Sequence, residues 1–131
     1  MSEYHEVDLD LVDEKSIVSS LEELGYNPVV VTEAVPLEGY MGDSRSQRAH
    51  IIIPRSQVGS ASNDLGFEKV NGKYIMRISE YDMNTSKFNK NEFSKNYKKH
   101  YVLNKLERSG KFKKKSVTNK DGKIVIKLRR R

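Results

Sequence analysis

The chain opens with alternating hydrophobic and polar positions and then changes to a helical period. Aliphatic residues alternate with acidic ones over residues 3–11, which is typical of a half-buried strand. From Asp13, whose side chain is suited to cap a helix, apolar residues recur at helical spacing until Gly25. We therefore expect a strand that is followed at once by a helix.

Two aliphatic runs in the middle of the chain have the length of strands. Residues 29–32 are largely β-branched and predict a buried strand. Residues 49–53 predict a second strand, which Pro54 ends because proline cannot donate to a continuing sheet. We expect a loop or an irregular strand over residues 38–47 and a flexible or turn-rich connection over residues 55–63.

The next part of the chain predicts a hairpin, a break and a long helix. Residues 67–70 and 73–79 flank Asn71-Gly72, a strong signal for a two-residue turn because both residues tolerate a positive φ. Residues 82–91 are polar and predict a break. Residues 92–108 contain neither glycine nor proline and carry aromatic residues at every fourth position, so they predict a second helix.

The end of the chain predicts a further hairpin, formed by residues 112–118 and 123–128. The predicted order is therefore β-α-β-β-β-β-α-β-β. We expect a single α+β domain over residues 1–131, an antiparallel sheet of about five to seven strands with two helices on one face. We expect residues 129–131 to follow as a basic tail, either ordered or disordered.

Composition narrows the chemistry that the chain can perform. The absence of cysteine excludes disulfides, thiolate zinc sites, iron–sulfur ligation and cysteine nucleophiles. The three histidines, His5, His50 and His100, are far apart and show no metal-binding spacing, so we expect no metal and no cofactor. Nothing approaches an apolar run of about 18 residues, the length of a membrane span. Since the acidic N-terminus also lacks a targeting pattern, we expect a soluble protein of the cytoplasm, host cytoplasm or plastid stroma.

Charge is distributed very unevenly along the chain. Residues 1–86 contain 7 Lys and Arg against 15 Asp and Glu, a net charge of −8, whereas residues 87–131 contain 17 against 3, a net charge of +14. Nucleic acids are bound chiefly by cations that displace condensed counterions, with about 6 to 10 phosphate contacts in a typical protein. The candidate contacts lie on the second predicted helix, the terminal hairpin and the tail: Lys95, Lys98, Lys99, Lys111, Lys113, Lys114, Lys115, Lys123, Lys127, Arg129, Arg130 and Arg131.

These cations predict a non-enzymatic accessory or binding protein whose partner is a polyanion, with RNA or DNA slightly preferred. The alternative is a protein-interaction subunit, in which the same cations contact an acidic partner protein or the chain's own acidic N-terminal part.

Three further patterns carry a functional and a structural interpretation each. Glu80 and Asp82, two positions apart at a predicted strand end, suit a magnesium or acid–base site, or simply a solubilising strand end. Residues 43–46 and 55–57 combine hydroxyls with arginines that suit a phosphate, or form ordinary mobile loops. The aromatic stripe of the second predicted helix, Phe93, Tyr97 and Tyr101, suits either the core or base stacking, and its spacing favours the core.

Several short motifs together resemble a known family. They are Leu24-Gly25-Tyr26, Gly39-Tyr40-Met41-Gly42, Asn71-Gly72-Lys73-Tyr74, the helix end at Gly110 and the Asp121-Gly122 turn. The chain resembles a small conserved family of unknown function in cyanobacteria, in red-algal plastids as a hypothetical reading frame, and in some large phages. The neighbouring genes of its members imply a partner ATPase of the AAA type or a ferredoxin-like protein. The resemblance supports the alternative of an ATPase-associated subunit or a phage particle component, and it implies no catalytic residues.

Overall fold

The computed structural model describes residues 3–85, 87–110, 112–120 and 123–130, the last two ranges by their backbone alone. In chain order the elements are β1 (Tyr4–Leu11), α1 (Glu14–Glu23), β2 (Val29–Glu38), β3 (Ser44–Ile53), α2 (Arg55–Val58), β4 (Leu65–Val70), β5 (Lys73–Ser79), α3 (Glu80–Thr85), α4 (Lys90–Arg108), β6 (Phe112–Lys120) and β7 (Lys123–Arg130).

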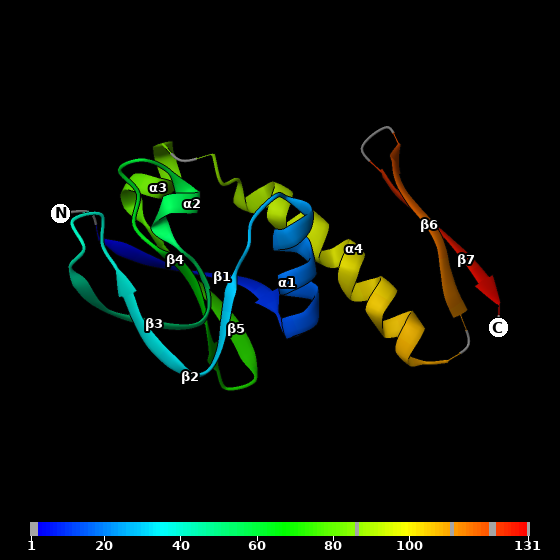
Figure 1. The fold of residues 1–131 in the computed structure, drawn as a ribbon. Coiled ribbons are helices and arrows are strands. Elements are labelled where there is room, and N and C mark those ends of the chain that lie inside the picture. Colours follow the sequence, from blue (N-terminus) through cyan, green and yellow to red (C-terminus); the bar gives the residue numbers. More distant parts are fainter. Residues whose placement is uncertain (1–2, 86, 111, 121–122, 131) are drawn as a thin grey trace.

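The strands form two separate antiparallel sheets. The larger one has five strands in the order β1-β5-β4-β3-β2, and β6 pairs with β7 in a two-stranded sheet of its own. The long helices α1 and α4 pack on one face of the larger sheet, and β6–β7 lies on the far side of them (Figure 1). The predicted α+β class, the antiparallel sheet and the pair of helices on one face are therefore confirmed.

Local sequence signals define α1 at both ends. The Asp13 carboxylate accepts a hydrogen bond from the Ser16 backbone N–H (3.2 Å), as expected of an N-cap. At the other end Gly25 adopts a φ of +94°, and the Tyr26 N–H donates to the Leu21 carbonyl (2.9 Å). This arrangement satisfies the last carbonyls of the helix and turns the chain toward β2.

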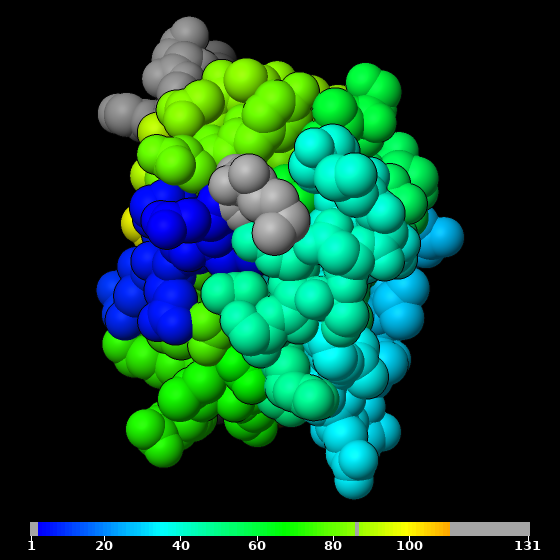
Figure 2. Space-filling model, turned by 90° about the vertical axis from the view of Figure 1, so that its left-hand side faces the viewer, coloured from blue at the N-terminus to red at the C-terminus, as the bar shows by residue number. Residues whose placement is uncertain are grey.

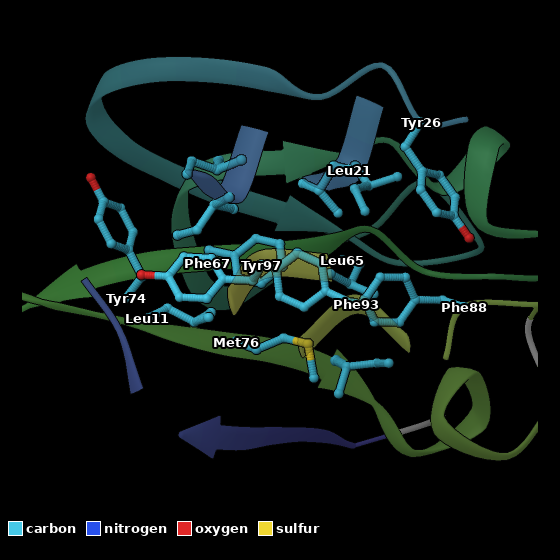
Figure 3. Packing of buried hydrophobic residues seen from close by; sticks show 14 of the residues in the cluster. Leu11, Leu21, Tyr26, Leu65, Phe67, Tyr74, Met76, Phe88, Phe93 and Tyr97 are labelled. Atoms are coloured by element: carbon cyan, nitrogen blue, oxygen red, sulfur yellow. The ribbon is translucent and has the colours of Figure 1, made fainter. Parts of the chain in front are cut away.

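The main core lies between the helices and the sheet (Figure 3). Phe93 of α4 packs against Phe67 of β4, with ring centroids 5.3 Å apart, and against Tyr97 at 6.4 Å. The Tyr97 hydroxyl accepts hydrogen bonds from the backbone N–H groups of Val12 (2.8 Å) and Asp13 (3.1 Å). The core interpretation of the aromatic stripe is thus confirmed, and Tyr97 also fixes the link between β1 and α1.

A smaller cluster on the opposite face of the sheet depends on a glycine. There Leu37 and Ala49, from the hairpin β2–β3, are fully buried against β4. A Cβ at Gly66 of β4 would lie 2.5 Å from the Ala49 Cβ and 2.9 Å from Leu37 Cδ2. Only glycine therefore allows the hairpin to approach β4 this closely.

Three local predictions differ from the structure. Residues 29–32 are not buried, since β2 is an edge strand and Val29 and Val30 remain 47% and 45% exposed. Residues 55–58 and 80–85 form the short helices α2 and α3. The polar composition of residues 80–85 did not indicate a helix. Helix α3 begins where the Ser79 hydroxyl accepts a hydrogen bond from the Asp82 N–H (3.2 Å). Residues 44–47 belong to β3, where the register with β2 shifts, which agrees with the expected irregular strand.

Candidate functional site

The candidate polyanion-binding residues fall in two places. Lys95, Lys98 and Lys99 lie on α4, and seven more lie on β6 and β7, whose backbone alone is described. Lys111 and Arg131 lie outside the described residues.

One face of α4 presents lysines to solvent. Lys95, Lys98 and Lys105 are exposed, with the exposed Val102 between them. Their spacing of three and seven residues places them on one side of the helix, opposite the buried Phe93. The outward placement expected of Lys95 and Lys98 is confirmed. Lys105 joins them although it was not among the predicted residues; its position seven residues after Lys98 was the signal for it.

Lys99 does not belong to this lysine face. Its side chain is only 6% exposed, and its Nζ donates to both carboxylate oxygens of Glu23 on α1, at 2.7 and 2.6 Å. Lys99 is therefore placed with the contacts between α4 and α1 and not with the exposed lysines, because the next position around the helix faces α1. Burial acts to raise the pKa of Glu23, but hydrogen bonds from Lys99 and Asn96 and the charges of Lys99 and His100 outweigh it, so this pKa is lowered.

Polar contacts fix α4 against α1. The Asn104 amide donates to the Ser16 hydroxyl (3.0 Å), and the Asn96 amide donates to the Ser20 carbonyl (3.4 Å). Both serines are fully buried, and their small side chains leave room for the asparagines between the helices. The lysine face therefore stands on a helix that several specific contacts hold in place, a feature that the apolar pattern of the sequence did not indicate.

The pairing of β6 with β7 sets cationic positions opposite one another. In the backbone register Lys113 pairs with Arg129, and Lys120 pairs with Lys123. Like charges at directly opposed positions destabilise a strand pair, and an isolated two-stranded hairpin is marginally stable in water even without them. Negative charge from another part of the protein or from a bound partner would therefore stabilise this hairpin.

The body of the protein and the hairpin segment carry opposite charge. Residues 1–110 contain 14 Lys and Arg against 17 Asp and Glu, a net charge of −3. Residues 111–131 contain 10 against a single acid, Asp121, a net charge of +9. The positive charge of the whole protein thus comes from its last 21 residues.

The proposed carboxylate pair does not form a joint site. Glu80 is exposed at the start of α3, whereas Asp82 is 1% exposed and faces the interior. The Asp82 carboxylate accepts hydrogen bonds from the Ser79 hydroxyl (2.7 Å) and from the Asn63 backbone N–H (3.0 Å). The expectation of two carboxylates on one face is wrong because these residues lie on a helix, where a spacing of two separates side chains.

The arginines of the two candidate phosphate loops make contacts within the protein. Arg55 lies 3.3 Å from the Glu38 carboxylate and donates to the Tyr40 carbonyl (3.1 Å). Arg45 lies over the ring of Tyr4, 5.1 Å from its centroid. Both arginines therefore contact other parts of the protein: Arg55, on α2, stabilises the turn between β2 and β3, and Arg45, on β3, packs on Tyr4 of β1.

In the part of the chain that the structure describes, no group of three or more histidine, aspartate or glutamate side chains is arranged to hold a metal ion. None of the helices in this part has both the length and the hydropathy that crossing a membrane requires.

Comparison with known proteins finds one family. A family model described as "Protein of unknown function (DUF1257)" matches residues 20–126, from the middle of α1 into β7. No curated protein and no solved structure matches the chain.

Proposed function

The chain belongs to the DUF1257 family, whose function is unknown, and from its charge arrangement we propose that it is a non-enzymatic polyanion-binding protein. The polyanion is RNA or DNA. The hairpin β6–β7 makes the principal contact, and the exposed lysines of α4, Lys95, Lys98 and Lys105, extend it.

The observation that carries the proposal is a separate hairpin with cationic positions paired across its strands, in a segment, residues 111–131, that has a net charge of +9. Within the protein this pairing costs stability. A nucleic acid backbone removes the repulsion, because each phosphate that contacts a cation also releases condensed counterions. The segment's 10 cations and the three on α4 are enough for the roughly 6 to 10 phosphate contacts of a typical nucleic-acid-binding protein.

The test compares two triple variants of the full chain that lose the same charge. In one, Lys113, Lys114 and Lys115 become glutamine; in the other, the remote cations Lys15, Arg48 and Lys69 do. We expect binding of a single-stranded oligonucleotide to weaken with salt, and the first variant to reduce the slope of log K against log salt by about 2. The second should change that slope by less than about 1. Equal slopes for both variants, or affinity independent of salt, would overturn the proposal.

A second candidate is a protein-interaction subunit, in an AAA-type ATPase-associated complex or a phage particle. It is favoured by apolar side chains exposed around β2 and the turn after it, among them Met41, which is 73% exposed. Affinity purification with and without nuclease distinguishes the two candidates. A defined protein partner that withstands both nuclease and high salt supports this one, whereas loss of the bound material on nuclease treatment supports the first.

A further inference from the structure

A hollow of about 390 Å³ lies between α3 and the start of α4, and it is lined by Ile78 of β5 and by residues 83–84 and 87–91. This volume is at the lower end of the range for small-molecule sites, about 300 to 1,000 Å³. Helix α3 stands at the end of the molecule that faces the viewer in Figure 2, and α1 and α4 separate it from β6–β7 in Figure 1. The hollow therefore lies apart from the hairpin, and Lys95, Lys98 and Lys105 do not line it.

The charged side chains that line the hollow itself are both positive, and Glu92 lines the smaller hollow beside it. Lys87 and Lys90 line it and are both exposed. Among the described residues no carboxylate lines the hollow or pairs with either lysine. Lys87 instead lies over the ring of Tyr26, 5.5 Å from its centroid, a contact that leaves the lysine's charge in place. The hollow thus suits an anionic group.

The side-chain amides of Asn84 and Asn89 supply a hydrogen-bond acceptor and a donor to the hollow. Asn84 donates through its Nδ2 to the Glu80 carbonyl (3.0 Å), which leaves its Oδ1 as an acceptor. Asn89 accepts through its Oδ1 from the backbone N–H groups of Asn91 (2.9 Å) and Glu92 (3.0 Å), which leaves its amide NH₂ as a donor. Asn89 thereby occupies two N–H groups at the start of α4, so the lysines, rather than the helix end, provide the anion site.

The third component is an apolar wall. Ile78 and Phe88 are nearly buried beneath the hollow, and Met83 is partly exposed beside it. A methionine thioether makes favourable contacts with aromatic rings. Inorganic phosphate would not use this wall, and an ionised aliphatic acid would offer no donor to the Asn84 Oδ1.

We propose that this hollow binds a nucleoside monophosphate, either free or as the phosphorylated end of a nucleic acid strand. The phosphate contacts Lys87 and Lys90, the base edge pairs with the asparagine amides, and the face of the base lies against Met83. The strand-end form of the proposal rests on the polyanion-binding function proposed above, whereas the free-nucleotide form does not.

The first experiment uses AMP, UMP and inorganic phosphate as probes of the full chain, followed by backbone amide NMR shifts. We expect AMP or UMP to shift resonances of residues 78–91 and to bind at least ten-fold more tightly than phosphate. The variant K87Q/K90Q should weaken binding at least ten-fold. The matched control K15Q/K69Q, which loses the same charge from exposed positions outside both the hollow and the lysine face, should change it less than two-fold. Nucleotide binding no tighter than that of phosphate, or equally weakened in both variants, would overturn the proposal.

A second experiment distinguishes the two sources of the nucleotide and separates this proposal from the first. A 5′-phosphorylated oligonucleotide is compared with its 5′-hydroxyl counterpart. Tighter binding of the phosphorylated form, lost in K87Q/K90Q, identifies the strand end. If AMP shifts the resonances of residues 78–91 and no oligonucleotide binds, the ligand of the hollow is the free nucleotide. This result would overturn the polyanion-binding function but not the proposal for the hollow. If an oligonucleotide binds but neither it nor AMP shifts the resonances of residues 78–91, the proposal for the hollow is overturned. The polyanion-binding function would then stand.

Discussion

Lys98 and Lys99 are neighbours in the sequence that the structure assigns to different roles, and separate substitutions K98Q and K99Q test this assignment. Lys98 points into solvent, whereas Lys99 holds both carboxylate oxygens of Glu23 at 2.7 and 2.6 Å. K99Q should therefore destabilise the fold without changing the salt dependence of nucleic acid binding. K98Q should instead reduce the salt dependence of nucleic acid binding and leave the stability of the fold nearly unchanged.

The cost of K99Q follows from the exposure of both partners. Removing one member of a fully buried ion pair costs about 3 to 5 kcal/mol, because the remaining charge stays buried without compensation. Glu23 is 43% exposed, so water can solvate its carboxylate once Lys99 is gone, and the attraction that is lost was already screened. We therefore expect a loss of about 1 to 2 kcal/mol in the free energy of unfolding. K98Q, on the exposed face, should change this free energy by about 0.5 kcal/mol or less.

Urea unfolding and salt-dependent binding measure the two effects on the same samples. With a urea m-value of about 2 kcal/mol/M, K99Q should lower the unfolding midpoint by about 0.5 to 1 M. K98Q should reduce the slope of log K against log salt by about 0.7 on single strands, and K99Q should leave it unchanged. If K99Q instead reduces this slope as K98Q does and leaves the midpoint unchanged, the placement of Lys99 against α1 is refuted.

Three further substitutions test the core and its electrostatics. Tyr97→Phe should cost about 1 to 3 kcal/mol in urea unfolding, because two backbone N–H groups lose their acceptor; a cost within error of zero would contradict this. Gly66→Ala should cost about 1 to 3 kcal/mol by overpacking, and adding Ala49→Gly should recover part of it, whereas additive costs would exclude a direct clash. Because the pKa of Glu23 is lowered in the folded protein, its contribution to stability is present above its ordinary pKa of 4.5 and is lost as the pH falls through the folded value. K99Q should therefore flatten the loss of stability in acid, and an unchanged pH profile would contradict the pairing.

The elements that the sequence predicted well are those whose signals are local. Asp13 and Gly25 define α1 through contacts with residues a few positions away. Asn71 and Gly72 adopt φ values of +50° and +81° and form the expected hairpin turn. Each of these features depends on the backbone preferences of the residue itself, so one sequence is enough to predict it.

The features that the sequence did not predict depend on contacts between distant parts of the chain. The valines at the start of β2 have the composition of a buried strand, but the order of strands leaves β2 at the edge. Asp82 is placed by Asn63, 19 residues earlier, and Lys99 by Glu23, 76 residues earlier. Helical spacing was enough to distinguish the buried face of α4 from the exposed face. Only the position of α1 shows that Lys99, at the boundary between the two faces, is buried.

The position of α4 connects the two proposals physically. It separates the hollow beside α3 from the hairpin β6–β7 (Figure 1), so a strand that contacts both must pass over or around this helix. With 19 residues α4 is about 28 Å long, roughly the length of eight stacked nucleotides at 3.4 Å each. The body of the protein has a net charge of −3 and repels such a strand elsewhere, whereas Lys95, Lys98 and Lys105 give α4 an exposed cationic face. If one strand occupies both the hollow and the hairpin, these three lysines define its path, because its phosphates would otherwise have to cross an acidic surface.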